Sequence, residues 1–174
     1  YVDRWGRCVM ASIIRGSDDF DTAINGRVVQ MVNFQTGVVA TGTTIIPMDD
    51  TIPQITEGTE YMTLNITPKH ASNRLVINVS IFATSDTNNY MTTALFVGTT
   101  ANALSANSTV QGANNWPLNS TIIHEMVSGS TSTLTFRVRF GGQATETSTF
   151  NGFGGARKFG TMPKSSITIT EYEP

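Results

Sequence analysis

The sequence predicts an all-β protein, an antiparallel β-sandwich of about eight to nine strands, on three observations. Stretches in which apolar and polar residues alternate with a period of two recur along most of the chain. Clusters of turn residues, such as SDTNN, SGSTS and FGGQ, separate these stretches. Only 14% of the 174 residues are charged, while β-branched residues and 15 glycines are abundant, a composition that disfavours helices.

The first 25 residues differ from the rest because they show no clean period. They gather Asp18, Asp19 and Asp21, and a turn signal, Asn25-Gly26, follows. This pattern predicts a connector or the end of a stalk, followed by a β-sandwich head domain over residues 26–174. The aspartates lack the spacing and the downstream glutamate of a calcium loop, so we expect a solvated loop and no metal.

Two details near the start of the chain add to this expectation. The sequence begins with Tyr1 rather than Met, which indicates a piece of a longer polypeptide. Its single cysteine, Cys8, excludes an internal disulfide framework, and nothing around it indicates an activated thiol.

The first predicted strands follow the connector. Residues 26–34 carry apolar residues on both faces, which predicts an interior strand. Residues 61–67 place Met62, Leu64 and Ile66 on one face and polar residues on the other. In residues 74–82 the inward set is Leu75, Ile77, Val79 and Ile81.

The second half of the chain continues in the same way. Residues 93–98 are apolar on both faces, which predicts a strand covered twice, with a neighbouring subunit as one candidate cover. After them, Ala and Leu in residues 100–110 would allow a short helical turn, but Ser and Asn disfavour it. Further strands are expected in residues 120–127, 133–140, 145–153 and 165–172; in 133–140 the inward set is Leu134, Phe136, Val138 and Phe140.

The strands carry few Lys and Pro residues that would protect sheet edges from pairing with other chains. We therefore expect the edges to be covered by loops or by another copy of the chain. Together with a strand that is apolar on both faces, this favours an oligomer, without fixing the number of subunits.

Two passages resemble the receptor-binding heads of tailed-bacteriophage tail fibres. Residues 46–79, IPMDDTIPQITEGTEYMTLNITPKHASNRLVINV, resemble a block in which a Pro-rich crossing, an EGTEY-like turn and a strand ending in ITP precede a long aliphatic strand. Residues 149–172 are similar to the usual ending of such modules, a Gly-rich basic loop before a Ser/Thr/Ile strand. With GRVVQMV at the start, the likeness covers nearly all of residues 26–174.

The resemblance implies a jelly-roll-like head, a homotrimer, at the distal end of a tail fibre on the virion. Its implied partners are the rest of the fibre and a bacterial surface glycan or other outer-surface receptor. It implies no particular receptor, because the loops of these modules vary.

Charge and hydropathy limit the other partners. A net charge of -2 gives no basic stripe for phosphates, so we expect no nucleic acid. No apolar run approaches the roughly 18 residues of a spanning helix, so we expect no membrane insertion.

Catalytic motifs are scarce, and we expect neither enzymatic activity nor a cofactor. His124 and Glu125 are adjacent on a strand and therefore point to opposite faces. Glu57 and Glu60 flank a glycine turn, and turn chemistry explains them more simply than a glycosidase pair.

A carbohydrate site would need exposed aromatic faces with polar neighbours on loops. The candidate aromatic residues are Tyr90, Trp116 and Phe153, each of which could instead fill the core or cover an edge. The polar candidates are Asp86, Asn88, Asn89, Asn114, Asn115 and Arg157. Arg137 and Arg139 share one strand face and could line a subunit interface, contact an anionic sugar or serve as solubilising charge.

Together with the resemblance, the sequence thus predicts a non-enzymatic fibre tip that attaches a virion to a host-surface carbohydrate or other surface receptor. Two alternatives remain: a trimerisation or capping module of a fibre, and an accessory domain of a carbohydrate-processing enzyme.

Overall fold

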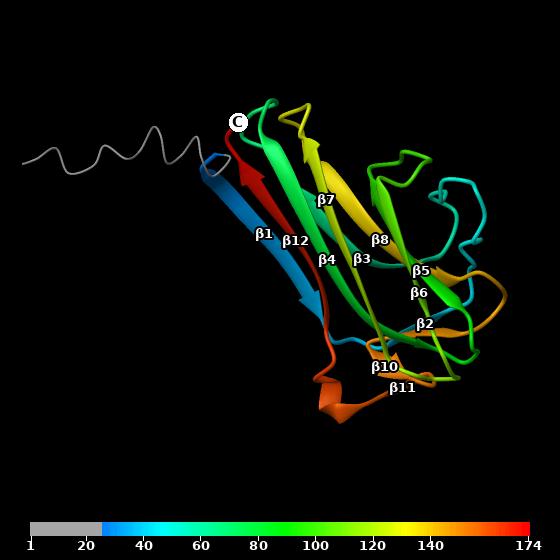
Figure 1. The fold of residues 1–174 in the computed structure, drawn as a ribbon. Coiled ribbons are helices and arrows are strands. Elements are labelled where there is room, and N and C mark those ends of the chain that lie inside the picture. The colour runs from blue at the N-terminus through cyan, green and yellow to red at the C-terminus, as the bar shows by residue number, and fades with distance from the viewer. Residues whose placement is uncertain (1–25) are drawn as a thin grey trace, which may run out of the picture.

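The computed structural model describes residues 26–174. The predicted connector, with Cys8 and the aspartate group, lies outside the described residues. The described part is a sandwich of two antiparallel sheets packed face to face (Figure 1), and it contains no α-helix. None of its helical segments is long and apolar enough to cross a membrane.

The first sheet has four long strands. Its order is β1 (Val28–Thr36), β12 (Ser165–Tyr172), β4 (Arg74–Ser85) and β7 (Leu118–Val127). Two short strands, β9 (Ser148–Phe150) and β2 (Ala40–Gly42), extend it, because β9 pairs with the last residues of β4 and β2 pairs with β9.

The second sheet has the order β3 (Thr59–Ile66), β8 (Leu134–Gly142), β5 (Tyr90–Val97) and β6 (Ser105–Val110). A two-stranded hairpin, β10 (Gly152–Phe153) and β11 (Ala156–Arg157), leads to a 3-10 turn at Phe159–Thr161. The long strands cross repeatedly from one sheet to the other along the chain, in a jelly-roll manner, which confirms the predicted fold class.

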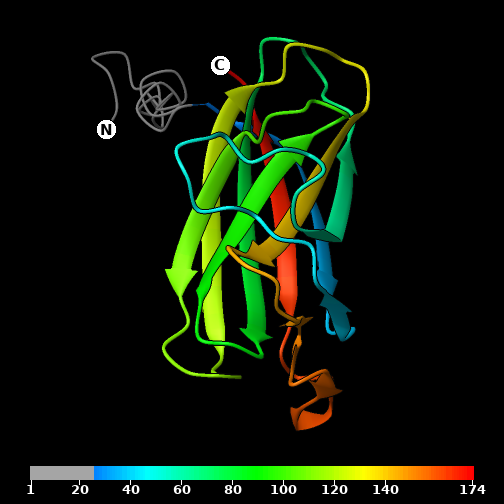
Figure 2. The same cartoon turned by 90° about the vertical axis from the view of Figure 1, so that its right-hand side faces the viewer.

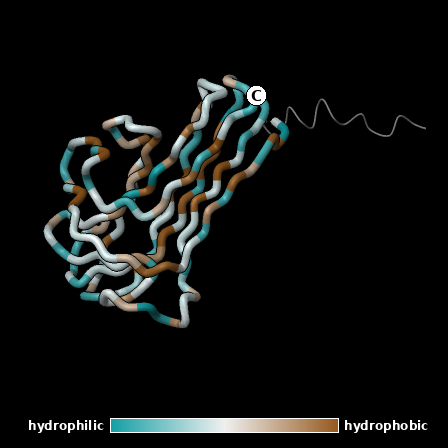
Figure 3. Tube along the Cα trace, turned by 180° about the vertical axis from the view of Figure 1, so that it is seen from behind, coloured by the Kyte–Doolittle hydropathy of each residue, from teal (hydrophilic) through white to brown (hydrophobic). Residues whose placement is uncertain are grey.

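The core lies between the sheets and follows the predicted alternation. Leu75, Ile77 and Ile81 of β4 are completely buried, as are Phe136 and Phe140 of β8. Figure 3 shows apolar positions lying side by side on neighbouring strands. Where β3 approaches β9, Tyr61 stacks on Phe150 with ring centroids 4.7 Å apart.

The segment between β2 and β3 forms a second, smaller core. It crosses the outer face of the second sheet (Figure 2), where Ile46 packs with Ala94 and Phe96 of β5, and all three are completely buried. A backbone hydrogen bond from Ile46 N to Gly142 O, 2.9 Å long, fastens the segment to β8. The two-faced apolar strand is therefore covered by its own chain, and the suggested neighbouring subunit is not its cover.

One other expectation is wrong. Residues 26–34 contain an edge strand rather than an interior one, because β1 pairs within the sheet with β12 alone and Met31 is 65% exposed. The apolar side chain of Met31 therefore lies on the surface, and the strand does not have a second buried face. Residues 105–110, where Ser and Asn disfavour a helical turn, form strand β6, which pairs with β5.

The two ends of the sandwich differ. At one end β1 begins opposite the end of β12, with Val28 paired to Tyr172 near the C-terminus (Figure 1). The hairpin β10–β11 and the turn at Phe159–Thr161 lie at the other end. The chain therefore enters the sandwich at the end remote from these loops.

Candidate functional site

Three loops meet at the end of the sandwich that carries the β10–β11 hairpin. They connect β4 to β5, β6 to β7 and β8 to β9. Backbone hydrogen bonds join them: Asn115 N donates to Ser85 O over 2.6 Å, and Gln143 N donates to Tyr90 O over 3.1 Å.

A buried amide, that of Gln111, locks two of these loops together. Its Oε1 accepts from Ser85 N at 2.7 Å, while its Nε2 donates to Ser85 O at 2.6 Å. The same Nε2 donates to Thr87 O and Ala113 O at 3.1 and 2.9 Å. One side chain therefore fixes both loop backbones, as expected for a preorganised binding surface.

A buried carboxylate, that of Glu146, ties the third loop to the first. Its Oε2 accepts hydrogen bonds from Thr87 Oγ1 and Asn89 Nδ2, both 2.8 Å long. Position 142 is glycine for a steric reason, because a Cβ there would lie 2.0 Å from Glu146 Oε1. The three loops thus form one connected unit.

These loops and the hairpin enclose a hollow of about 360 Å³. Three of its lining residues have left-handed backbones, Asn115 at φ 57°, Gly154 at φ 56° and Gly155 at φ 75°. Asparagine and glycine are the residues that tolerate this conformation best. The lining residues are Asp86, Asn115, Thr147, Thr149, Gly154 and Gly155.

The lining side chains present hydrogen-bond acceptors. Asp86 Oδ1 accepts from Thr147 N at 2.8 Å, and Thr149 Oγ1 accepts from Gly155 N at 2.9 Å. Asn115 Oδ1 is buried and has no hydrogen-bond partner in the described part of the chain. No lining residue is a cation. The hollow is therefore suited to a ligand that donates hydrogen bonds, such as the hydroxyl groups of a sugar.

The structure brings the sequence-predicted site residues to this same end, but among them only Asn115 and the neighbouring Asp86 line the hollow. Trp116 follows Asn115 and is 62% exposed, so its ring is free to stack. Tyr90 begins β5 and is 42% exposed. Asn88 and Asn114 are exposed on their loops, Phe153 is half-buried in β10, and Arg157 is exposed in β11.

Asn89 has a structural role, because it donates to Glu146 and its Oδ1 accepts from Tyr90 N. Sequence reasoning missed four lining residues, Thr147, Thr149, Gly154 and Gly155. A turn signal marks the region, but only the pairing of β9 with β4 brings it beside Asp86 and Asn115.

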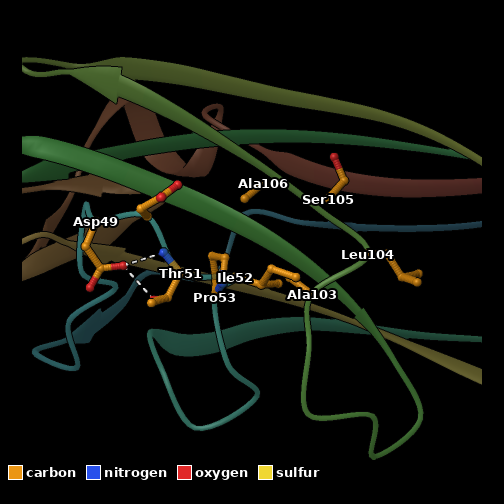
Figure 4. Close-up of a pocket in the computed structure, with 9 residues that line it drawn as sticks. Asp49, Thr51, Ile52, Pro53, Ala103, Leu104, Ser105 and Ala106 are labelled. Atoms are coloured by element: carbon orange, nitrogen blue, oxygen red, sulfur yellow. Dashed lines mark hydrogen bonds between the residues drawn. The ribbon is translucent and has the colours of Figure 1, made fainter.

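A second hollow, of about 420 Å³, lies between the segment that precedes β3 and strand β6 (Figure 4). Its acidic residue Asp49 is already engaged within its own turn, because the Asp49 carboxylate accepts hydrogen bonds from both Thr51 Oγ1 and Thr51 N. These hydrogen bonds, the side-chain one first, lower the pKa of Asp49 below its usual value. No aromatic side chain lines either hollow, but Trp116 directly follows a lining residue of the first, whereas no lining residue of the second has an aromatic neighbour in the sequence, which makes the second the weaker candidate for sugars.

The remaining charged candidates have structural partners. Arg137 Nη1 and Arg139 Nη2 lie 2.9 and 3.4 Å from the two carboxylate oxygens of Glu60. Glu57 Oε2 accepts from Gln54 N within its own turn. The arginines are thus neither free nor purely solubilising. Within residues 26–174 no group of three or more His, Cys, Asp or Glu side chains is placed to hold a metal ion.

Comparisons with known proteins give only distant likenesses. No protein-family model matches the chain, and no curated protein matches it. Among solved structures, Eiger TNF from S. frugiperda is 9% identical over 82% of this chain and 93% of its own, with a TM-score of 0.45. A CBM4 carbohydrate-binding module is 16% identical over 74% of this chain and 76% of its own, at 0.40.

A tailspike domain of bacteriophage CBA120 is 12% identical over 71% of this chain and 19% of its own, with a TM-score of 0.30. Identities and TM-scores at this level carry no information about activity. The fold class rests on the strands and their pairing.

Proposed function

We propose that this chain is the receptor-binding head of a phage tail fibre, which attaches the virion to a carbohydrate of the bacterial surface without catalysing a reaction. The hollow lined by Asp86 and Asn115 is the observation that carries the proposal. Its lining is rich in hydrogen-bond acceptors, and an exposed aromatic residue, Trp116, directly follows the lining residue Asn115 in the chain. Sugar recognition uses this combination of hydrogen bonds and ring stacking.

The placement of the hollow supports the same function. It lies at the end of the sandwich opposite the start of β1. A ligand attached to a large surface can therefore reach the hollow end-on.

The homotrimer is part of the proposal, and the outer face of the first sheet is its proposed interface. The chain's own segment covers part of the second sheet, but the described residues leave this face of the first sheet open. A shallow hollow of about 280 Å³ runs over it, lined mainly by hydroxyl, amide and aliphatic groups. One of its lining residues, Ile123 of β7, is 76% exposed. No charged side chain lines this hollow, so the hollow can be buried at low desolvation cost.

Replacing Ile123 with aspartate is expected to dissociate the trimer, because the change buries an unpaired carboxylate in the interface. Light scattering at micromolar concentration measures the effect. Wild type should have three times the monomer mass, and Ile123→Asp should have the monomer mass. The matched control is Val110→Asp, on β6 of the other sheet, where the side chain is 59% exposed. A monomeric wild type would contradict the trimer.

Removing the polar wall of the hollow is expected to weaken binding to host cells. Asn115→Gly deletes the unpartnered amide yet accepts the left-handed backbone, and the loss of a hydrogen bond should lower affinity about fivefold. Trp116→Ala should lower it about tenfold through lost stacking. Labelling of intact bacteria from a strain panel by fluorescent protein, titrated to saturation, gives the affinities.

The control for this titration is Asn65→Ala, an exposed change on β3 that removes a polar group away from the loops. If wild type labels no strain, or if both loop variants bind as wild type does, the adhesive function is wrong. Loss of fibre assembly on deletion of residues 26–174, with binding unaffected by the loops, would instead favour the capping module.

A further inference from the structure

The segment of residues 154–164, which we call the tip loop, projects beyond the hollow at the same end of the sandwich (Figures 1 and 2). Three consecutive residues in it, Phe159, Gly160 and Thr161, have left-handed backbones, with φ of 47°, 60° and 78°. Phenylalanine and the β-branched threonine rarely adopt this conformation, and such strain is concentrated at functional sites.

The strained turn exposes large apolar side chains. Phe159 is 81% exposed and Met162 is 73% exposed. The neighbouring β1–β2 turn abuts the loop, because a Cβ on Gly37 would lie 2.8 Å from Thr161 O, and it carries Val38, which is 71% exposed. Backbone bonds from Thr161 N to Lys158 O and from Met162 N to Phe159 O, both 3.1 Å long, hold the turn in shape.

The same loop is cationic. Arg157, Lys158 and Lys164 are all exposed, and residues 147–170 contain no Asp or Glu. The β1–β2 turn that abuts the loop, residues 37–39, is also free of acidic residues. The tip loop therefore combines positive charge with unburied apolar surface, although the whole chain has a net charge of -2.

We propose that the tip loop binds the surface of an anionic lipid layer, with its cations at the headgroups and Phe159 and Met162 among the outermost acyl groups. Cations near an anionic lipid surface and apolar side chains at its boundary both strengthen such binding. A polyanion without acyl groups would use the lysines alone and would leave the apolar residues without a role. The contact is interfacial and involves no spanning segment.

The test is co-sedimentation of the full chain with lipid vesicles. Wild type should partition into vesicles of phosphatidylcholine with an equal share of phosphatidylglycerol, should bind pure phosphatidylcholine vesicles far less, and should be released by salt. The double change Lys158→Gln with Lys164→Gln should weaken binding about 25-fold, since each cation contributes about fivefold. Phe159→Ser should weaken it about tenfold.

Two control variants show whether the lipid contact is specific to the tip loop. Lys69→Gln removes an exposed lysine near the opposite end and should bind as wild type does. Asn115→Gly should also leave vesicle binding unchanged, so the vesicle test is independent of the sugar site. Phe159→Ser should not alter binding to soluble polyphosphate.

Three results would overturn the proposal. The first is equal binding of wild type to neutral and anionic vesicles, or none to either. The second is an unchanged vesicle affinity of Phe159→Ser, which would leave a simple polyanion contact. The third is a fall in molar mass of Phe159→Ser, which would mean that a second copy of the chain covers the loop.

Discussion

Replacement of Phe96 with alanine is expected to lower the free energy of unfolding by about 3–5 kcal/mol, the usual cost of truncating a buried phenylalanine. Phe96 is completely buried under the chain's own segment, against Ile46. Loss of the ring leaves a cavity that the segment cannot close without giving up its hydrogen bond to Gly142. Urea titration followed by tryptophan fluorescence measures the change.

The same substitution shows whether Phe96 is covered by its own chain or by another subunit. In the Ile123→Asp background, which should be monomeric, Phe96→Ala should cost the same amount as in wild type. If the cost disappears in that background, Phe96 is buried by a neighbouring subunit and the assignment of its cover is wrong.

Replacement of Glu171 with alanine is expected to lower the free energy of unfolding by about 3 kcal/mol at neutral pH, because it leaves several hydrogen-bond donors without an acceptor. Glu171 is completely buried in β12. Its Oε1 accepts from Lys69 N at 2.7 Å and from Asn73 Nδ2 at 2.6 Å, and its Oε2 accepts from Gln30 Nε2 at 2.5 Å. The carboxylate thus joins β12 to β1 and to the β3–β4 turn.

The matched control for this substitution is Glu173→Ala. Glu173 is on the same end of the chain, but its ion pair with Arg27 is exposed at the surface. Its loss should cost about 0.5 kcal/mol or less. A similar cost for the two variants would contradict the structural role of Glu171.

Glu171 also gives a pH dependence. Burial raises its pKa, but hydrogen bonds from Gln30, Asn73 and the backbone of Lys69 and His70 outweigh burial and hold the pKa below its ordinary value of 4.5. A lowered folded-state pKa stabilises the fold above the unfolded value, and this stability is lost as the pH falls through the folded value. The difference in free energy of unfolding between wild type and Glu171→Gln should therefore be constant above about pH 5 and become smaller below about pH 4. A constant gap down to about pH 2 would contradict this assignment.

The sequence predicted the strands whose two faces differ. In residues 74–82 and 133–140 one face is apolar throughout, so local alternation alone reveals which side chains are buried. It could not place residues 26–34 at an edge, because strand order depends on pairing between distant segments. It also missed the cover over Phe96, since Ile46 and Ile55 lie in a proline-containing segment without periodicity.

The candidate site was predictable in part. The run of asparagines before Trp116 and the turn at Asp86 marked two loops that do meet. Thr149 and Gly154 come beside these two loops because Thr149 pairs with Thr84 of β4. The sequence around Thr149 gives no sign of this long-range pairing. Nor could the sequence reveal that Gln111 and Glu146, ordinary polar residues in it, are buried and hold the loops together.

The most direct test of the sugar site is a crystal structure of the protein soaked with an oligosaccharide from the surface polysaccharide of a strain that it labels. We predict a sugar ring in the hollow between Asp86, Asn115 and Gly154, with a hydroxyl about 2.7 Å from Asn115 Oδ1. A sugar bound only in the hollow beside Asp49 would contradict this prediction. So would a crystal without bound sugar when the same protein still labels the cells.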